Sequence, residues 1–221
     1  MKREIKRQYK RRVTDPRHIR SYLEAGTVRK LQIGVGANVR KGWLNTDISP
    51  VNPDIVFMDA TARMPFDDDV FDYVFCEHMI EHIPYLAGRG MLGECRRVLK
   101  PGGRIRVCTP DLAKIVRLYG SAKTPTEDAY VTWSIREFVP EADATDPTFT
   151  INNFMRNWGH QFIYNEAIME RALLHAGFSD IVKCELGASD HPALQGLEND
   201  SRMPPGFLEL ESMTFEAAKP I

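Results

Sequence analysis

The stretch LQIGVGAN, residues 31–38, contains the pattern that decides the fold of this chain. Its apolar start, Leu31-Gln32-Ile33, is typical of a buried strand, and Gly34-Val35-Gly36 then forms a tight turn at the carboxyl end of that strand. Further strand-like runs follow at 43–48, 54–58 and 71–76. Strands in this close succession, followed by a helical stretch, favour a mostly parallel sheet with right-handed crossovers.

Outside this stretch, helices and strands are expected to alternate along the chain. Helices are predicted at 16–25, 87–99, 111–120, 125–138, 151–157 and 165–177, and strands at 104–108, 181–186 and 213–217. The sequence Lys100-Pro101-Gly102-Gly103 predicts a turn, because neither a helix nor a strand readily contains these residues. The last two strands follow each other without a predicted helix. The predicted fold is α/β: a doubly wound, mostly parallel, seven-stranded Rossmann-like sheet with an antiparallel C-terminal edge hairpin.

Composition places the chain among ordinary globular proteins, since 43% of its 221 residues are hydrophobic and 27% are charged. No apolar run approaches the roughly 20 residues of a membrane helix, and no apolar core follows the basic N-terminus as it would in a secretory signal. The four cysteines form no CxxC pair, which favours reduced thiols over disulfides or a zinc cluster. These features predict a cytoplasmic protein without a membrane span.

The N-terminus is expected to form a basic arm, residues 1–14, ahead of a single domain over residues 15–221. The net charge of the chain is −1, yet residues 1–20 contain nine Lys or Arg and two acids, a local charge of +7. Such an arm could bind a polyanion or an acidic membrane surface, although a solvated tail is the commoner case. Within the domain we predict a cofactor half at about 27–120 and acceptor-side insertions at about 121–165 and 187–206.

Two aspartates and the glycine turn together form a candidate nucleoside pocket. Asp47 ends the second predicted strand and Asp59 ends the third. Ligands of such sheets bind outside the carboxyl ends of the strands, near the point where the strand order reverses. A carboxylate at the second strand can accept hydrogen bonds from a ribose diol, and one at the third can accept from an exocyclic amine.

The same region lacks the pattern of a phosphate-binding loop. In the dinucleotide fingerprint G-x-G-x-x-G, a third glycine precedes a helix that faces the pyrophosphate. Here Val39 occupies that position, and Asp47 is only 11 positions after Gly36, which leaves room for about one helical turn. The pattern therefore favours a phosphate-free adenosine ligand over NAD or ATP.

Short motifs along much of the chain form a recognisable set. They are LQIGVGAN (31–38), GWLNTDI (42–48), Asp59 with MPF (64–66), FDYV (71–74), EHMIEH (77–82), RVLKPGG (97–103), WGH (158–160), IY (163–164) and AGF (176–178). This set resembles the class I S-adenosylmethionine-dependent methyltransferases, and within them a bacterial type 11 branch associated with surface-glycan assembly. The resemblance extends from about residue 19 to the C-terminus and implies S-adenosylmethionine as the cofactor.

The resemblance also implies where the parts of the cofactor lie. It places the methionine part against Gly34, Gly36 and the backbone near Cys76, the ribose on Asp47, and the adenine beside Asp59 and Ala60. Val35 stands where many members of the family have a smaller residue or cysteine. The candidate cofactor-binding set is Gly34, Val35, Gly36, Asp47, Ile48, Asp59, Ala60, Cys76 and Glu77.

A second motif, His78-Met79-Ile80-Glu81-His82, matches the zinc-protease pattern H-x-x-E-H. On a helix, His78 and His82 would share one face and could bind zinc, with Glu81 as a base. The motif follows a strand in a βαβ series, however, and no third ligand is evident downstream. Zinc hydrolysis is therefore kept as the minor alternative, and no metal site is expected.

The favoured interpretation places Glu77 and His78 at the carboxyl end of the fourth strand, facing the transferable methyl group. His78, His82 and the more distant His160 are candidate catalytic residues, because imidazole titrates near neutrality. Alternatively, His82 packs the helix that follows, and Glu81 pairs with an arginine such as Arg97. We expect His160 or Tyr164 to face His78 across the methyl group.

Three classes of acceptor are compatible with this sequence. A sugar or another small polar molecule suits a set of polar residues in the irregular half of the chain, namely Asn153, Arg156, His160, Tyr164, Asp190, His191 and Glu198. RNA could use the basic arm, yet no Asn/Asp-Pro-Pro-aromatic motif follows the fourth strand, which disfavours methylation of a base amine. A pure binding role would require a pocket without chemistry. The favoured prediction is a methyltransferase that acts on a small polar acceptor such as a sugar or glycan precursor.

Overall fold

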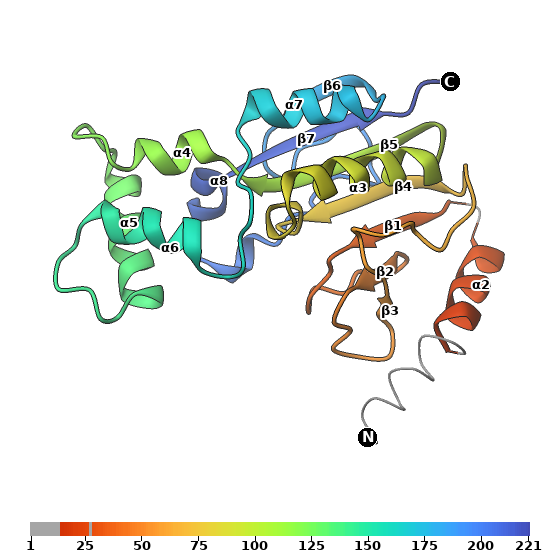
Figure 1. Ribbon diagram of the computed structural model, residues 1–221, viewed down its shortest axis with the longest axis horizontal. Helices are drawn as coiled ribbons and strands as arrows, with labels where there is room; N and C mark the ends of the chain where they lie inside the picture. The colour runs from red at the N-terminus through yellow and green to blue at the C-terminus, as the bar shows by residue number, and fades with distance from the viewer. Residues whose placement is uncertain (1–13, 27) are drawn as a thin grey trace.

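The computed structural model describes residues 14–26 and 28–221, so nearly all of the basic arm lies outside the described residues. Within these residues, seven strands form one sheet in the order β3-β2-β1-β4-β5-β7-β6 (Figure 1). The strands are β1 (Lys30–Ile33), β2 (Leu44–Asp47), β3 (Val56–Phe57), β4 (Phe71–Glu77), β5 (Leu99–Pro110), β6 (Ser179–Cys184) and β7 (Ser212–Ala218). Neighbours from β3 to β5 pair in parallel, and β7 pairs antiparallel with both β5 and β6. The predicted α/β fold with an antiparallel C-terminal pair is confirmed.

The strand order reverses between β1 and β4, which are hydrogen-bonded neighbours. From β1 the chain proceeds outward to β2 and β3, and from β4 it proceeds in the opposite direction to β5. The carboxyl ends of β1 and β4 therefore meet at the switch point, where ligands of such sheets bind. The last two residues of β4 and the segments that follow the two strands contain seven of the twelve predicted site residues.

Helices cover one face of the sheet and also extend beyond its carboxyl edge. The helices are α2 (Asp15–Ala25), α3 (Tyr85–Val98), α4 (Leu112–Arg117), α5 (Pro125–Phe138), α6 (Pro147–Arg156), α7 (Glu166–His175) and α8 (Phe207–Glu211), with 3-10 turns η2 (Ile80–His82) and η3 (Asp200–Arg202). In Figure 1, α3 and α7 lie over the sheet, while α4, α5 and α6 form a helical lobe beyond the ends of β4 and β5. No helix of the described chain is both long and apolar enough to cross a membrane.

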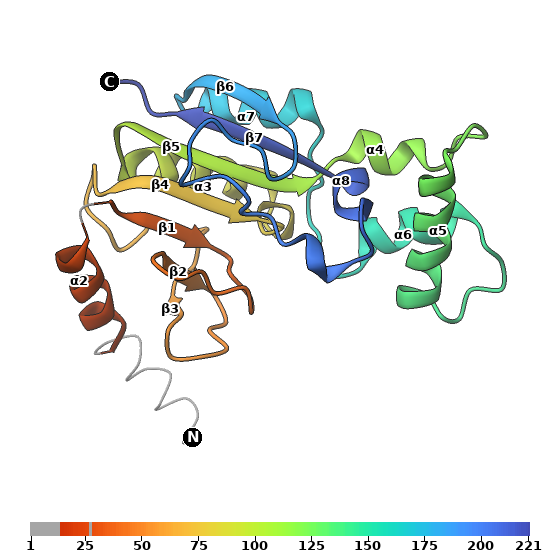
Figure 2. The ribbon, with the colours of Figure 1, turned by 180° about the vertical axis from the view of Figure 1, so that it is seen from behind.

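The opposite face of the sheet is covered by the segment between β6 and η3 (Figure 2). Leu194 and Leu197 of this segment pack with Trp43 and Phe75 in a small apolar cluster. Arg106 of β5 is fully buried beneath the same segment, where it donates hydrogen bonds of 2.6 Å to Glu198 and to Glu216. Ionic as well as apolar contacts therefore hold the segment against the sheet.

Two larger apolar clusters account for the remaining core. The main cluster lies between the sheet and the helices α3 and α7 and includes Leu31, Phe71 and Leu173. The second cluster joins the helical lobe to α8 through residues such as Tyr130, Phe154 and Phe207. Thr124 begins α5 with a capping box to Glu127, which satisfies backbone donors at the start of the helix.

The structure corrects the prediction that the Lys100–Gly103 sequence lies outside any strand. These residues are part of β5, where the pairing with β4 shifts register between Phe71 and Tyr73. Gly102 has φ of +77°, which a glycine adopts without strain. The turn residues are thus accommodated as an irregularity inside a long strand.

Two helices also differ from the sequence prediction. The helix expected at 151–157 begins at Pro147, because Asp146 caps it by accepting a hydrogen bond from the Thr148 N–H. The short helix α8 lies between the last two strands, where no helix was predicted.

Candidate functional site

The turn after β1 exposes backbone at the switch point of the sheet. Gly34 and Gly36 have φ of +68° and +54°, in the left-handed region that favours glycine. A Cβ atom on Gly34 would lie 2.1 Å from the Cγ of Met79, whereas one on Gly36 would meet no atom within 4 Å. Gly34 is therefore required for packing, and Gly36 borders open space into which a ligand can fit.

Asp47 joins the end of β2 to the glycine turn. Its Oδ2 accepts a hydrogen bond of 2.8 Å from the Gly36 N–H, and its Oδ1 accepts one of 2.7 Å from the Ser49 N–H. The residue is half-buried. Each carboxylate oxygen has two lone pairs, so the oxygens keep capacity for a ribose diol.

The remaining predicted cofactor residues surround this pair. Asp59 follows β3, and its Oδ1 accepts hydrogen bonds from the Thr61 N–H and hydroxyl at 2.9 and 2.7 Å. Ile48 is exposed, whereas the side chains of Val35, Ala60 and Cys76 are buried. The structure thus places Asp47 and Asp59 at the ends of adjacent strands, and the three buried residues could contact a cofactor mainly through their backbone.

Glu77, the last residue of β4, contacts the segment that follows β6. Its Oε1 accepts a hydrogen bond of 2.8 Å from the Asn199 N–H, and the Asn199 side chain donates to Asn38 Oδ1 at 3.0 Å. Burial raises the pKa of the Glu77 carboxyl above its ordinary value. Glu77 therefore holds the segment after β6 across the end of β1, and its partners differ from those of the adjacent His78.

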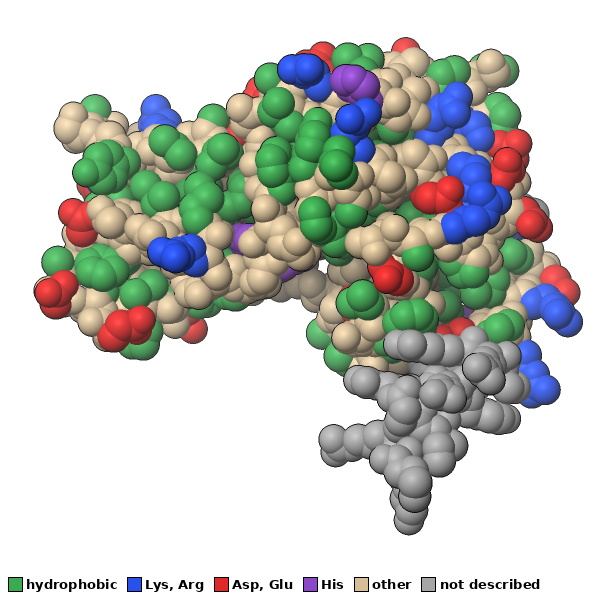
Figure 3. Space-filling view, in the orientation of Figure 1, with side chains coloured by type: hydrophobic (Ala, Val, Ile, Leu, Met, Phe, Trp, Pro, Cys, Tyr) green, Lys and Arg blue, Asp and Glu red, His purple; other side chains and the backbone are tan. Residues whose placement is uncertain are grey.

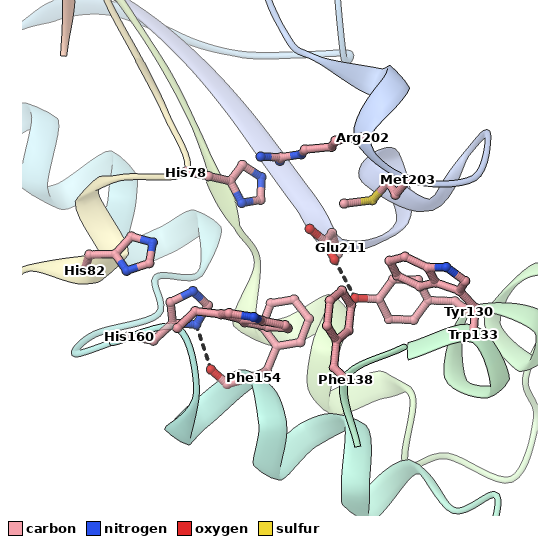
Figure 4. Close-up of a pocket in the computed structure, with 11 residues that line it drawn as sticks. His78, His82, Tyr130, Trp133, Phe138, Phe154, His160, Arg202, Met203 and Glu211 are labelled. Atoms are coloured by element: carbon pink, nitrogen blue, oxygen red, sulfur yellow. Dashed lines mark hydrogen bonds between the residues drawn. The ribbon is translucent and has the colours of Figure 1, made fainter. Parts of the chain in front are cut away.

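A cavity of about 270 Å³ lies on the other side of the end of β4, between that strand and the helical lobe (Figure 4). It is lined by His78, His82, Tyr130, Trp133, Phe138, Phe154, Trp158, His160, Arg202, Met203 and Glu211. The space-filling view shows histidine side chains in the hollow between the helical lobe and the sheet (Figure 3). The cavity thus combines an aromatic wall with a set of titratable groups.

His78 reaches this cavity from a strained backbone position. Its φ is +46°, which is rare for a residue other than glycine. Its Nε2 lies 2.8 Å from Ser212 Oγ, and its Nδ1 lies 3.4 Å from Glu81 Oε1. Burial, assisted by the positive charge of Arg202, lowers the pKa of His78 well below its ordinary value. The imidazole is therefore neutral near pH 7.

Glu81 is completely buried beside His78. Its Oε2 accepts a hydrogen bond of 3.0 Å from Thr109 Oγ1, while its Oε1 has no hydrogen-bond partner among the described residues. Burial raises the pKa of this carboxyl to about 8. The suggested pairing with Arg97 is not formed, because Arg97 binds Glu94 and Asp68 instead.

The H-x-x-E-H motif does not lie on a helix. Residues Ile80–His82 form a 3-10 turn after β4, and His78 lies before it in the left-handed conformation. His78 and His82 therefore do not share a helix face, and the geometry of a zinc-protease helix is absent from this motif.

Among the predicted acceptor-side residues, His160 reaches the cavity. Its ring lies 4.8 Å from the ring of His82, measured between centroids. Tyr164 is instead fully buried in the main core, where its hydroxyl would collide with a Cβ on Gly88. His160, rather than Tyr164, is thus on the same cavity as His78.

The other polar residues of the irregular half lie elsewhere. Asn153 and Arg156 border a separate hollow along α6, Asp190 and His191 lie near Arg104, and Glu198 pairs with Arg106. The single acceptor cluster suggested by the sequence is therefore divided among different surfaces.

Several cavity residues were not singled out from the sequence. Tyr130 and Trp133 are three residues apart on α5, a spacing that could have indicated a shared helix face. Glu211 accepts a hydrogen bond of 2.5 Å from the Tyr130 hydroxyl, and Arg202 belongs to η3. The last two residues follow no periodic pattern, so only the folded structure brings them to the site.

Comparison with known proteins agrees with this geometry. Residues 34–107 match a family model described as a methyltransferase domain. The matching segment begins at the glycine turn and ends within β5, so it contains Asp47, Asp59 and the end of β4. Over these residues the chain is therefore similar to a methyltransferase domain.

Two curated relatives match short parts of the chain. A demethylmenaquinone methyltransferase of Clavibacter sepedonicus is 40% identical over 79 residues, which is 33% of this chain and 31% of that protein. A sterol 24-C-methyltransferase of Schizosaccharomyces pombe is 51% identical over 41 residues, 19% of this chain and 10% of that protein. The chain thus matches less than a third of the length of either relative.

Solved structures share the fold over nearly the whole chain. An S-adenosylmethionine-dependent methyltransferase from Mesorhizobium loti has a TM-score of 0.51 at 15% identity, covering 92% of this chain and 96% of that one. One from Archaeoglobus fulgidus has a TM-score of 0.50 at 16% identity, covering 95% and 94%. At this level of identity the likeness concerns the fold.

Proposed function

We propose that this protein is an S-adenosylmethionine-dependent methyltransferase that acts on a small polar acceptor. The main support for this proposal is that two candidate sites lie next to each other at the end of β4. The glycine turn and Asp47 lie on one side of this strand end, and the cavity entered by His78 lies on the other. Methyl transfer is an in-line displacement, so an acceptor held in the cavity needs mainly alignment with the methyl group.

In this proposal, the residues of the cofactor side hold S-adenosylmethionine in three parts. Asp47 binds the ribose hydroxyls, and Asp59 with the backbone at Ala60 lies beside the adenine. The exposed backbone of Gly36 borders the methionine part, supported by the open space around this residue. Glu77 lies next to this part of the cofactor.

The acceptor is proposed to be a small polar molecule, such as a sugar or glycan precursor. The cavity volume of about 270 Å³ lies just below the roughly 300–1,000 Å³ of most ligand pockets, which favours a small molecule. Aromatic side chains such as Trp133 and Phe138 can pack against the apolar face of a ring, while Arg202 and Glu211 can bind its polar groups.

His78 is proposed as the group that accepts the proton of an acceptor hydroxyl. Its lowered pKa keeps the imidazole neutral, and its contact with Ser212 fixes the orientation of the ring. Such a base is required only where the acceptor loses a proton during transfer.

We also propose that the folded domain begins at Asp15. This residue is buried, and its Oδ2 accepts a hydrogen bond of 3.1 Å from the Phe57 N–H beside β3. A chain lacking residues 1–14 is therefore expected to remain folded and to bind the cofactor.

The proposed function is tested by screening acceptors for release of S-adenosylhomocysteine from S-adenosylmethionine. The panel contains sugars, sugar nucleotides, polyols, small amines and RNA, each with the wild-type chain and with Asp47→Asn. Turnover with a sugar or polyol that requires Asp47 would support the proposal. Turnover confined to RNA would overturn the assignment of a small acceptor, and turnover with no compound together with no cofactor binding would overturn the enzyme class.

A further inference from the structure

Three potential metal ligands meet at one end of the acceptor cavity. Glu81 and His82 follow β4, and His160 follows α6. One potential ligand atom from each of these residues lies within 4.8 Å of the other two. Glu81 Oε1 and His82 Nε2 are 4.0 Å apart. Figure 4 shows His82 and His160 close together, with His78 beside them.

The two chain segments that supply these residues are fastened to each other. The N–H groups of Gln161 and Phe162 both donate to the carbonyl of Glu81, at 2.8 and 3.1 Å. The side chain of Gln161 donates to the carbonyl of His82 at 2.9 Å. The juxtaposition therefore depends on backbone contacts that persist whichever rotamers the imidazoles adopt.

The backbone that leads into His160 is unusual. Trp158 has φ of +57° and Gly159 has φ of +78°. A left-handed conformation at tryptophan costs free energy and marks functional sites more often than ordinary loops. Here it reverses the chain, so that His160 comes to lie against His82.

Each of the three residues also has a partner that orients its potential ligand atom. His160 Nδ1 lies 2.7 Å from the carbonyl oxygen of Phe154, which can only accept, so Nδ1 carries the proton and Nε2 keeps a lone pair. The backbone of Trp158 lies beside His82 and favours the protonated imidazole, which partly offsets the lowering of its pKa by burial. Thr109 donates a hydrogen bond to Glu81 Oε2, while the buried Oε1 accepts no hydrogen bond among the described residues and lies 3.4 Å from His78 Nδ1. Outer contacts of this kind typically orient the ligands of a metal ion.

We propose that Glu81, His82 and His160 bind one divalent transition-metal ion, with zinc as the preferred metal. Two imidazoles and a carboxylate suit zinc, whereas magnesium and calcium prefer oxygen ligands. Zinc bonds of about 2.0–2.2 Å require ligand atoms roughly 3.4 Å apart, so the Glu81–His82 separation must close by about half an ångström. Three protein ligands leave a fourth position, and the cavity lies beside it.

The proposed role of the metal depends on the proposed methyltransferase function. It limits the acceptors of that function to one chemical class. A metal with one open position binds a hydroxyl or hydroxy-acid oxygen and lowers the pKa of its O–H group. The acceptor O–H bond breaks and the proton passes to solvent. The oxygen then forms a bond to the methyl carbon while the carbon–sulfur bond breaks, and its electron pair stays on sulfur as S-adenosylhomocysteine is released. The acceptor class is therefore an alcohol that can bind a metal ion, rather than an amine.

The site is tested by titrating the tag-free, chelator-stripped full chain with zinc chloride in competition with a chromogenic chelator. We expect one zinc ion per wild-type chain and a loss of affinity of at least tenfold in Glu81→Gln and in His160→Ala. The matched control is His175→Ala, because His175 Nδ1 also contacts a backbone carbonyl but lies on α7. Substoichiometric zinc binding, or equal affinity in wild type and both ligand variants, would overturn the site.

A second measurement does not depend on the variants being folded. X-ray absorption of zinc-loaded wild-type protein should show two imidazole ligands and no sulfur scatterer, whereas sulfur ligation would overturn the site. S-adenosylhomocysteine binding is measured on the same samples by calorimetry. Zinc bound without cofactor would contradict the proposed function and leave the metal site standing. Cofactor bound without zinc would contradict the metal site alone.

Discussion

The carboxylate of Asp47 accepts a hydrogen bond of 2.8 Å from the backbone N–H of Gly36, so the acid of one strand end holds the glycine turn of its neighbour. We predict that Asp47→Asn lowers the affinity for S-adenosylhomocysteine about 10- to 100-fold, because hydrogen bonds to a charged group contribute about 1.5–3 kcal/mol. The measurement is calorimetric titration. Asp54→Asn, which changes an exposed acid between β2 and β3, is the matched control and should bind normally. Equal affinities for the two variants would contradict the role of Asp47.

The strained position of His78 allows a substitution that removes the imidazole with little disturbance of the backbone. Asparagine tolerates a positive φ, so His78→Asn should keep the melting temperature and cofactor affinity near those of wild type. If His78 accepts the acceptor proton, turnover should fall roughly 10²–10⁴-fold. The measurement compares steady-state rates with calorimetric cofactor affinity. Loss of cofactor affinity and thermal stability together, at unchanged turnover per bound cofactor, would identify His78 as a structural residue.

The buried ion pair between Arg106 and Glu198 holds the segment after β6 on the sheet. Both side chains are almost fully buried, so Glu198→Ala leaves a buried guanidinium with Glu216 as its remaining acidic partner. We predict a loss of about 3–5 kcal/mol in the free energy of unfolding, measured with urea. Lys183→Ala, which breaks the exposed pair with Glu166, should cost no more than about 1 kcal/mol. Similar losses in both variants would show that the buried pair is not a main source of stability.

Glu211 should make stability depend on pH in the acidic to neutral range. Burial raises its pKa to about 7 in the folded protein, above the ordinary value of 4.5. Between these values the folded state keeps a proton that the unfolded state has lost, so stability falls as pH rises from 4.5 to 7. Glu211→Gln should remove up to about 1.4 kcal/mol per pH unit of this slope. Urea unfolding at several pH values checks this, with the exposed Glu209→Gln as control. An unchanged slope in Glu211→Gln would contradict the assignment.

The first half of the fold could be predicted because its signals are local. The apolar run before Gly34 and the acid at Asp47 follow directly from strand and turn chemistry. The irregularity at Gly102 could not be predicted in this way, because it depends on the pairing of Gly103 with Lys219 near the C-terminus. The five residues of α8 are likewise too short for a helical period to be visible.

The position of His160 beside Glu81 and His82 could not be predicted from the sequence for a related reason. Gln161 and His82 are 79 positions apart in the chain, and their hydrogen bond is one of three that hold the two segments together. No spacing rule connects two segments at that distance, so the sequence offered no third ligand for the H-x-x-E-H motif. Tyr164 illustrates the converse, since a polar residue that suggested an acceptor contact packs inside the core.

The most direct test of the central claim is calorimetric titration of the full chain with S-adenosylhomocysteine, NAD and ATP under the same conditions. The glycine turn without a third glycine, together with Asp47 and Asp59, predicts one binding site for S-adenosylhomocysteine and much weaker binding of both phosphate-bearing nucleotides. Asp47→Asn should weaken the first interaction selectively. Tighter binding of NAD or ATP than of S-adenosylhomocysteine would contradict the assignment of the cofactor and the methyltransferase function that depends on it.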